Sequence, residues 1–124
     1  MDNFEFIRNK MDLSNEELSK YLDDLNEIKR FVEGNNIKFE SNYKLGFYSH
    51  MVSFLERMKK RESINTVDES VKNCIEEGVL KLSEQLISSF TNKYGVELNN
   101  GEVILAAIHL QTAITMEKEG TNNE

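Results

Sequence analysis

The amino-acid sequence predicts an all-α fold, and three observations lead to this prediction. The 124 residues include no proline and only 6 glycines, so little interrupts the propagation of helices. Leu, Glu, Lys, Ile and Met, which favour helices, are plentiful. Apolar residues recur at steps of three and four along most of the chain, which is the period of an amphipathic helix. The length suits one domain with a single core.

The first strong helix signal covers residues 14–33. Ser14 is followed three residues later by Glu17, which is the pattern of a capping box at a helix N-terminus. Apolar residues then recur on one stripe, at Leu18, Tyr21, Leu22, Leu25, Ile28 and Val32. Gly34 can end the helix in the left-handed conformation. Residues 1–13 precede this helix as an N-terminal arm, which is either a short helix carrying Phe4, Phe6 and Ile7 or a mobile end.

The middle of the chain predicts three further helices. One runs from about Tyr43 to Lys60 and carries apolar residues on two adjacent stripes, so two of its faces are in use. A second covers residues 67–76, because Thr66 and Glu69 repeat the capping-box pattern. Gly78 then marks a bend before a third helix over residues 78–94.

The last predicted helix starts at Asn99 as its cap and extends to about Met116. Residues 103–108 form the longest uninterrupted apolar run, so apolar side chains surround the helix axis. We therefore expect this helix at the centre of the fold, and we expect the polar tail over residues 118–124 to fray. The predicted architecture is a compact five-helix bundle, with residues 14–117 as one helical domain.

The charge balance excludes several classes of function. The 15 Lys and Arg residues against 22 Asp and Glu residues give a net charge of −7 at pH 7, so we expect no direct contact with nucleic acid. The apolar run is too short to span a membrane, and the N-terminus lacks the pattern of a signal peptide. These features predict a cytoplasmic protein that has no membrane segment. The single Cys74 cannot form an internal disulfide and is expected in the core.

The sequence offers few groups for catalysis. Gly95 and Gly101 are not followed by Lys-Ser or Lys-Thr, which excludes a Walker-type phosphate loop. The spacing of His50, Cys74 and His109 does not match a pair of metal ligands on a helix. We therefore expect no catalytic residue, no bound metal and no cofactor. The acidic pairs at 16–17, 23–24 and 76–77 are expected on solvated helix faces.

Each of the two histidines has a charged residue seven positions away. His50 precedes Arg57 (57 − 50 = 7) and Glu102 precedes His109 (109 − 102 = 7), so each pair shares one helix face. A neutral imidazole is nucleophilic and can accept a phosphoryl group, whose charge an arginine would stabilise. The alternative is that a histidine among apolar neighbours, such as His109, is a core residue hydrogen-bonded at one nitrogen.

The segments around these histidines resemble the two histidine motifs of the PTS regulation domain (PRD) family. Residues 48–57 resemble the first motif, in which an apolar stretch and an arginine seven residues on follow the histidine. Residues 102–110 resemble the second motif, in which a glutamate lies seven residues before a histidine that ends an apolar run. The interval of 109 − 50 = 59 residues also fits such a domain.

This resemblance implies a regulatory module of the sugar phosphotransferase system that is not an enzyme. It implies that the phosphocarrier HPr or a sugar-specific enzyme IIB phosphorylates His50 or His109. It gives Arg57 and Glu102 the role of stabilising the phosphate or orienting the histidines. It also implies a homodimer, and a stand-alone PRD that affects transcription or metabolism through a further, unidentified protein.

Two other functions remain open. The first is a structural or accessory interaction protein on the same bundle, in which the histidines are not phosphorylated. The second is a small hydrolase or metal-dependent enzyme.

Overall fold

The computed structural model describes residues 4–39, 41–62, 64 and 67–122, and for residues 41, 42, 69 and 116–122 it describes the backbone only. Within these residues the predicted all-α class is confirmed, because they form six α-helices, five of them with seven or more residues, one 3₁₀ helix and no strand. The helices are α1 (Glu5–Met11), α2 (Asn15–Ser19), α3 (Leu22–Gly34), α4 (Ser41–Lys60), η1 (Glu69–Cys74), α5 (Glu77–Tyr94) and α6 (Asn100–Asn122).

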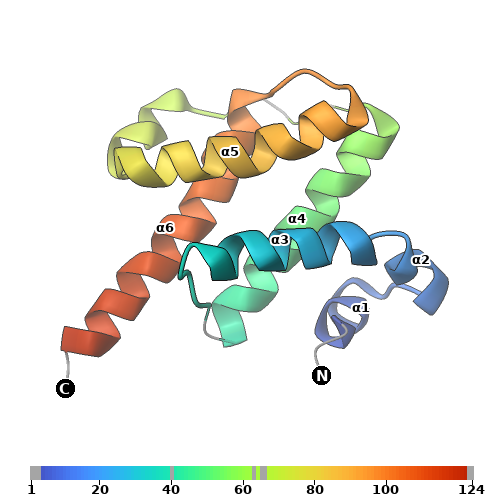
Figure 1. Ribbon diagram of the computed structural model, residues 1–124, viewed down its shortest axis with the longest axis horizontal. Coiled ribbons are helices and arrows are strands. Elements are labelled where there is room, and N and C mark those ends of the chain that lie inside the picture. Colours follow the sequence, from blue (N-terminus) through green and yellow to red (C-terminus); the bar gives the residue numbers. More distant parts are fainter. Residues whose placement is uncertain (1–3, 40, 63, 65–66, 123–124) are drawn as a thin grey trace.

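Helices α4 and α6 cross the molecule, and the other helices pack around them (Figure 1). Helix α5 packs against both α4 and α6, while η1 packs against α6. Helices α1 and α3 pack against α4, and α2 packs against α3. This arrangement buries many apolar side chains of α6, including Ile104, Ala107 and Leu110, as expected for a central helix, while Ile108 remains exposed.

The helix predicted over residues 14–33 is divided into α2 and α3. The capping box that starts it is present, because the Glu17 amide donates to Ser14 Oγ at 3.1 Å and the Ser14 amide donates to Glu17 Oε1 at 3.0 Å. The chain turns at Lys20 and Tyr21, where the backbone bonds shorten to the tighter i to i+3 pattern. Lys59 stabilises this turn from α4, because its Nζ donates to the Lys20 carbonyl at 3.0 Å and lies 4.6 Å from the centre of the Tyr21 ring.

The N-terminal arm is the short helix α1 in the residues that the structure describes. Phe4 and Ile7 are fully buried, and the ring of Phe4 lies 5.2 Å from that of Tyr48 on α4. The arm is therefore part of the hydrophobic core, because its apolar side chains pack against α4.

The segment before α5 differs from the prediction of an α-helix over residues 67–76. Thr66 lies outside the described residues, and the N-cap is Asp68, whose side chain accepts from the Ser70 amide at 3.0 Å. The segment that follows is the short 3₁₀ helix η1. Cys74, expected in the core, is instead exposed as the last residue of η1. The break predicted at Gly78 is confirmed to within one residue, because α5 begins at Glu77.

One residue of the acidic pairs is buried, contrary to the expectation of a solvated face. Asp24 is 4% exposed, and its carboxylate accepts hydrogen bonds from Lys93 Nζ and Tyr94 Oη at the end of α5. The neighbouring Asp23 is exposed as predicted. Because the C-terminal turn of α5 lies against the start of α3, only one of the two carboxylates meets a partner there.

The start of α6 is as predicted and its end is not. Asn99 caps the helix, because its Oδ1 accepts from the Gly101 amide at 2.8 Å and from the Glu102 amide at 3.3 Å. The helical backbone continues to Asn122, beyond the predicted end at about Met116, and residues 123–124 lie outside the described part. The residues at 117–119 are good helix formers, and the chain contains no proline to stop them.

Candidate functional site

The packing of α4 on α6 brings the two predicted motifs together in one site. The rings of His50 and His109 are stacked, with their centres 5.2 Å apart and 29° between their planes. Arg57 meets Glu102, with Nε donating to Oε2 at 2.7 Å and Nη2 donating to Oε1 at 2.8 Å. The two helices run antiparallel at this interface, since the step from His50 forward to Arg57 on α4 matches the step from His109 back to Glu102 on α6. We call the two contacts the histidine pair and the Arg57–Glu102 ion pair.

The equal intervals of seven residues explain why both contacts form at once. Seven residues are about 10 Å along a helix. Arg57 and Glu102 therefore lie about the same distance from their histidines, each on the face that contacts the other helix. The sequence places each histidine on a face with a charged residue, but the charged residues bond to each other across the interface. This pairing between helices was not part of the sequence prediction.

The Arg57–Glu102 ion pair is mostly shielded from water. The Glu102 side chain is 1% exposed and the Arg57 side chain is 20% exposed. Two parallel charge-assisted hydrogen bonds satisfy both oxygens of the carboxylate. Glu102 also lies in the first turn of α6, where the helix dipole favours a negative charge. The ion pair thus joins the first turn of α6 to the last turn of α4.

The histidines are held in their neutral form at pH 7. Burial lowers the pKa of His50 to about 4, and the positive charges of protonated His109 and of Arg57 act in the same direction. Burial also lowers the pKa of His109. A neutral imidazole keeps a lone pair on one ring nitrogen, so both rings are potential nucleophiles.

The two histidines differ in their access to solvent. His50 Nε2 is buried and has no hydrogen-bond partner among the described residues, and the same is true of the neighbouring Ser49 Oγ. His109 is half-buried, and neither of its ring nitrogens is enclosed in this way. It lies over Gly46, where an added Cβ would be 3.7 Å from His109 Cε1. The ring of Phe47 is 6.2 Å away on another side.

This environment does not match the alternative of a hydrogen-bonded core histidine. Within the part of the chain that the structure describes, no side chain or backbone group hydrogen-bonds to either imidazole. The same part contains no cluster of three or more His, Cys, Asp or Glu residues that could hold a metal ion. None of the described helices has the length and the apolar character needed to span a membrane.

A comparison with protein families identifies the domain. The family model of the PRD domain matches residues 25–113. The chain belongs to the PRD family. The match begins within α3 and ends within α6, so it includes the histidine pair and the Arg57–Glu102 ion pair of this PRD. Helices α1 and α2 precede it. Searches of curated proteins and of solved structures found no match to the chain.

Family membership confirms the resemblance seen in the two histidine motifs. It indicates, in general terms, a regulatory role in the phosphotransferase system. PRD domains are regulatory rather than catalytic. The structure adds that the two motifs of this PRD form one site at the α4–α6 interface.

Proposed function

We propose that this PRD is a cytoplasmic regulatory module that is reversibly phosphorylated on histidine by HPr or an enzyme IIB. In this proposal it acts on transcription or metabolism through a protein partner. The observation that supports it most directly is the histidine pair, in which two neutral imidazoles lie 5.2 Å apart, with an arginine–glutamate ion pair about two turns away on the same two helices.

The chemistry requires only a nucleophile and a place for the phosphate charge. The free lone pair of the imidazole attacks phosphorus and forms an N–P bond, while the bond between phosphorus and the donor breaks. Because neither ring carries a proton on both nitrogens at pH 7, no proton has to be removed before the attack. Arg57, seven residues after His50 on α4, supplies a positive charge that can stabilise the phosphate that forms.

His109 is the first acceptor in this proposal. A phosphoryl donor cannot reach His50 Nε2 in the observed arrangement, because that atom is buried. His109 is only half-buried, and neither of its ring nitrogens is enclosed as His50 Nε2 is. Phosphorylation of His50 at Nε2 therefore requires that α4 and α6 separate.

A phosphoryl group would alter the balance of charges at the α4–α6 interface. It adds a charge of about −1.5 to −2 at pH 7. This charge would attract Arg57 and repel the buried carboxylate of Glu102, so it would weaken the Arg57–Glu102 ion pair and favour a different packing of the two helices.

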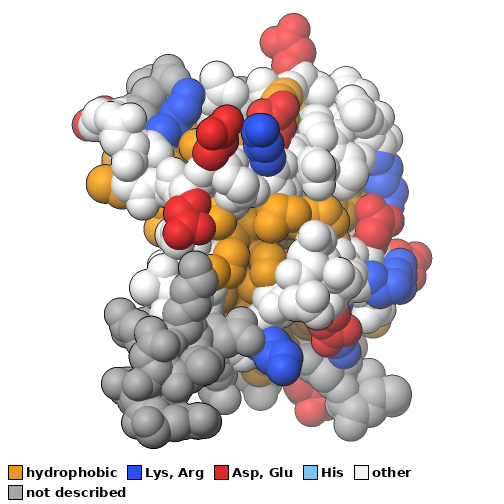
Figure 2. Space-filling view, turned by 60° about the vertical axis from the view of Figure 1, so that its left-hand side comes forward, with side chains coloured by type: hydrophobic (Ala, Val, Ile, Leu, Met, Phe, Trp, Pro, Cys, Tyr) orange, Lys and Arg blue, Asp and Glu red, His pale blue; other side chains and the backbone are white. Residues whose placement is uncertain are grey.

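We extend the proposal to a homodimer whose arrangement depends on phosphorylation. Hydrophobic side chains gather on one face of the molecule (Figure 2). Ile108, which precedes His109 on α6, is 36% exposed although it is a large hydrophobic residue. A second copy that covers α6 would lie beside the phosphorylated histidine, where the added charge can change the dimer contact.

Phosphotransfer to the purified protein tests this proposal. The protein is incubated with phosphoenolpyruvate, enzyme I and HPr, with and without enzyme IIB proteins, and acid-labile label is measured. We expect label on the wild type, its loss in His109→Ala, and its retention in Cys74→Ala, the control for transfer to a thiol. Circular dichroism shows whether each variant is folded.

Two results would contradict the proposal. Absence of label with every donor would favour the alternative, a structural or accessory interaction protein on the same bundle. The buried, unpartnered Nε2 of His50 is the observation that favours this alternative. Label that survives in the His50→Ala/His109→Ala double variant would place the phosphate elsewhere.

A further inference from the structure

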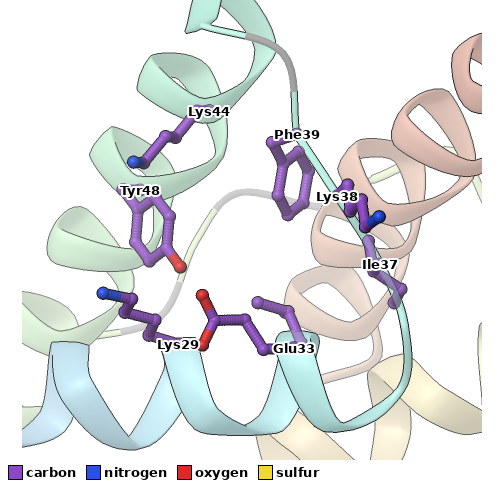
Figure 3. A pocket seen from close by; sticks show the side chains of 8 residues that line it. Lys29, Glu33, Ile37, Lys38, Phe39, Lys44 and Tyr48 are labelled. Atoms are coloured by element: carbon purple, nitrogen blue, oxygen red, sulfur yellow. The ribbon is translucent and has the colours of Figure 1, made fainter.

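A cavity apart from the histidine pair lies between α3, the segment that follows it, and the first turns of α4 (Figure 3). Its volume is about 210 Å³. Pockets for drug-sized ligands are commonly about 300–1,000 Å³, so this cavity accommodates only a small molecule. Its polar and charged lining distinguishes it from a packing defect, because defects in protein cores are apolar.

The charge of the lining is opposite to that of the whole chain. Among the described residues that line the cavity, the lysines Lys29, Lys38 and Lys44 and the carboxylate of Glu33 give 3 − 1 = +2. The whole chain carries −7. A concave positive surface on an acidic protein concentrates its field on small anions.

Several of these charged groups are free to bind a ligand. Lys29 and Glu33 are one turn apart on α3, but they form no ion pair, and no described residue pairs with them or with Lys38. A lysine that precedes a glutamate by four residues is the less favourable order for an ion pair on a helix. Figure 3 shows the carboxylate of Glu33 directed into the space below Tyr48 and Phe39.

Two aromatic rings, together with Val32 and Ile37, form the apolar part of the cavity lining. Phe39 and Tyr48 lie on opposite sides of the opening in Figure 3. Phe39 is fixed by stacking on Phe47, with 4.5 Å between ring centres and 14° between planes. An aromatic face of this kind can pack against the carbon atoms of a small ring.

We propose that this cavity binds a small phosphate monoester that also carries hydroxyl groups, a molecule of the size and chemistry of a monosaccharide phosphate. The ammonium group of Lys29 takes the phosphate, and Lys38 and Lys44 add positive charge to the lining. Glu33 accepts hydrogen bonds from hydroxyl groups, and Phe39 packs against the ring. This site is independent of phosphorylation at the histidine pair.

Titration of the ¹⁵N-labelled full chain with three probes tests the proposal. The probes are glucose 6-phosphate, glucose and inorganic phosphate, and amide shifts are followed by NMR. We expect saturable shifts over residues 29–33, 37–39 and 44–48 with glucose 6-phosphate. We expect weaker binding of inorganic phosphate and no binding of glucose, because both the charge and the ring contribute.

Variants separate a built site from general attraction between opposite charges. Lys29→Gln should weaken binding of glucose 6-phosphate about tenfold, the usual effect of losing one charged hydrogen bond. Lys81→Gln is the matched control, because Lys81 is a 72% exposed lysine on α5 whose nearest acid is Glu77. It should leave binding unchanged. Glu33→Ala should reduce the preference for glucose 6-phosphate over inorganic phosphate.

Three outcomes would overturn the proposal. These are shifts that do not saturate, an equal loss of affinity in Lys29→Gln and Lys81→Gln, or equal affinity for glucose 6-phosphate and inorganic phosphate. Circular dichroism of each variant confirms that it is folded, and both lysines are on the surface of long helices, where glutamine is well tolerated.

Discussion

Replacement of Arg57 by methionine should strongly destabilise the protein, because it leaves a buried charge without a partner. Methionine keeps most of the arginine stem in place but removes both hydrogen bonds to Glu102, which is 1% exposed. Breaking a buried ion pair by removing one partner costs about 3–5 kcal/mol. Arg57 is 20% exposed, so water reaches one side of the pair and we expect a loss of about 3 kcal/mol. For a domain of this length that lowers Tm by about 10 °C.

The assay is urea and thermal unfolding followed by circular dichroism. The matched control is Lys60→Met, which removes an exposed ion pair with Glu56 at 3.3 Å and should cost less than about 0.5 kcal/mol. The double variant Arg57→Met/Glu102→Leu should recover most of the lost stability, because it removes the unpaired charge as well. Equal losses in Arg57→Met and Lys60→Met, or a double variant less stable than Arg57→Met, would refute this reasoning.

Three further predictions concern stability. The pKa of His50 is about 4 in the folded state and 6.5 in the unfolded state. Between these two pH values the unfolded chain binds more protons than the folded protein, so the free energy of unfolding decreases as pH falls through this window. Between pH 7 and pH 4.5 the free energy of unfolding should therefore fall by about 2 kcal/mol more in the wild type than in His50→Gln, measured by urea unfolding; equal losses would contradict the assigned pKa. Asp24→Ala should cost about 2 kcal/mol by the same assay, whereas its exposed neighbour in Asp23→Ala should cost little; similar values would show that the bonds to Lys93 and Tyr94 contribute no stability. Gly46→Ala should increase the free energy of unfolding by about 0.5–1 kcal/mol and so raise Tm, because alanine favours a helix more than glycine does and its Cβ would make only an ordinary contact with His109. A lower Tm would show that this contact is too close.

Local signals in the sequence predicted most of the secondary structure. The capping box at Ser14, the cap at Asn99 and the break before α5 depend on residues within a few positions of one another, and all three are present. At the turn that divides α2 from α3, the backbone is bonded instead by Lys59, which is 39 positions from the carbonyl that it binds. A contact of that kind leaves no local pattern.

The candidate site was predicted in its residues but not in its contacts. The seven-residue intervals identified His50, Arg57, Glu102 and His109, because helical periodicity places each pair on one face. Which residue of one helix meets which residue of the other depends on how far α6 slides along α4, and that offset comes from packing of the whole core. The burial of Asp24 had the same cause, since its partners belong to the distant end of α5.

The antiparallel packing of α4 on α6 has a mechanical consequence. The histidine pair and the Arg57–Glu102 ion pair attach the same two helices at two points, about two turns apart. A slide of α6 by one turn, about 5.4 Å, would break both attachments together, and a smaller slide would leave neither with good geometry. The two contacts are therefore coupled through the position of α6 on α4, and a perturbation that shifts one of them along the helix axis also weakens the other.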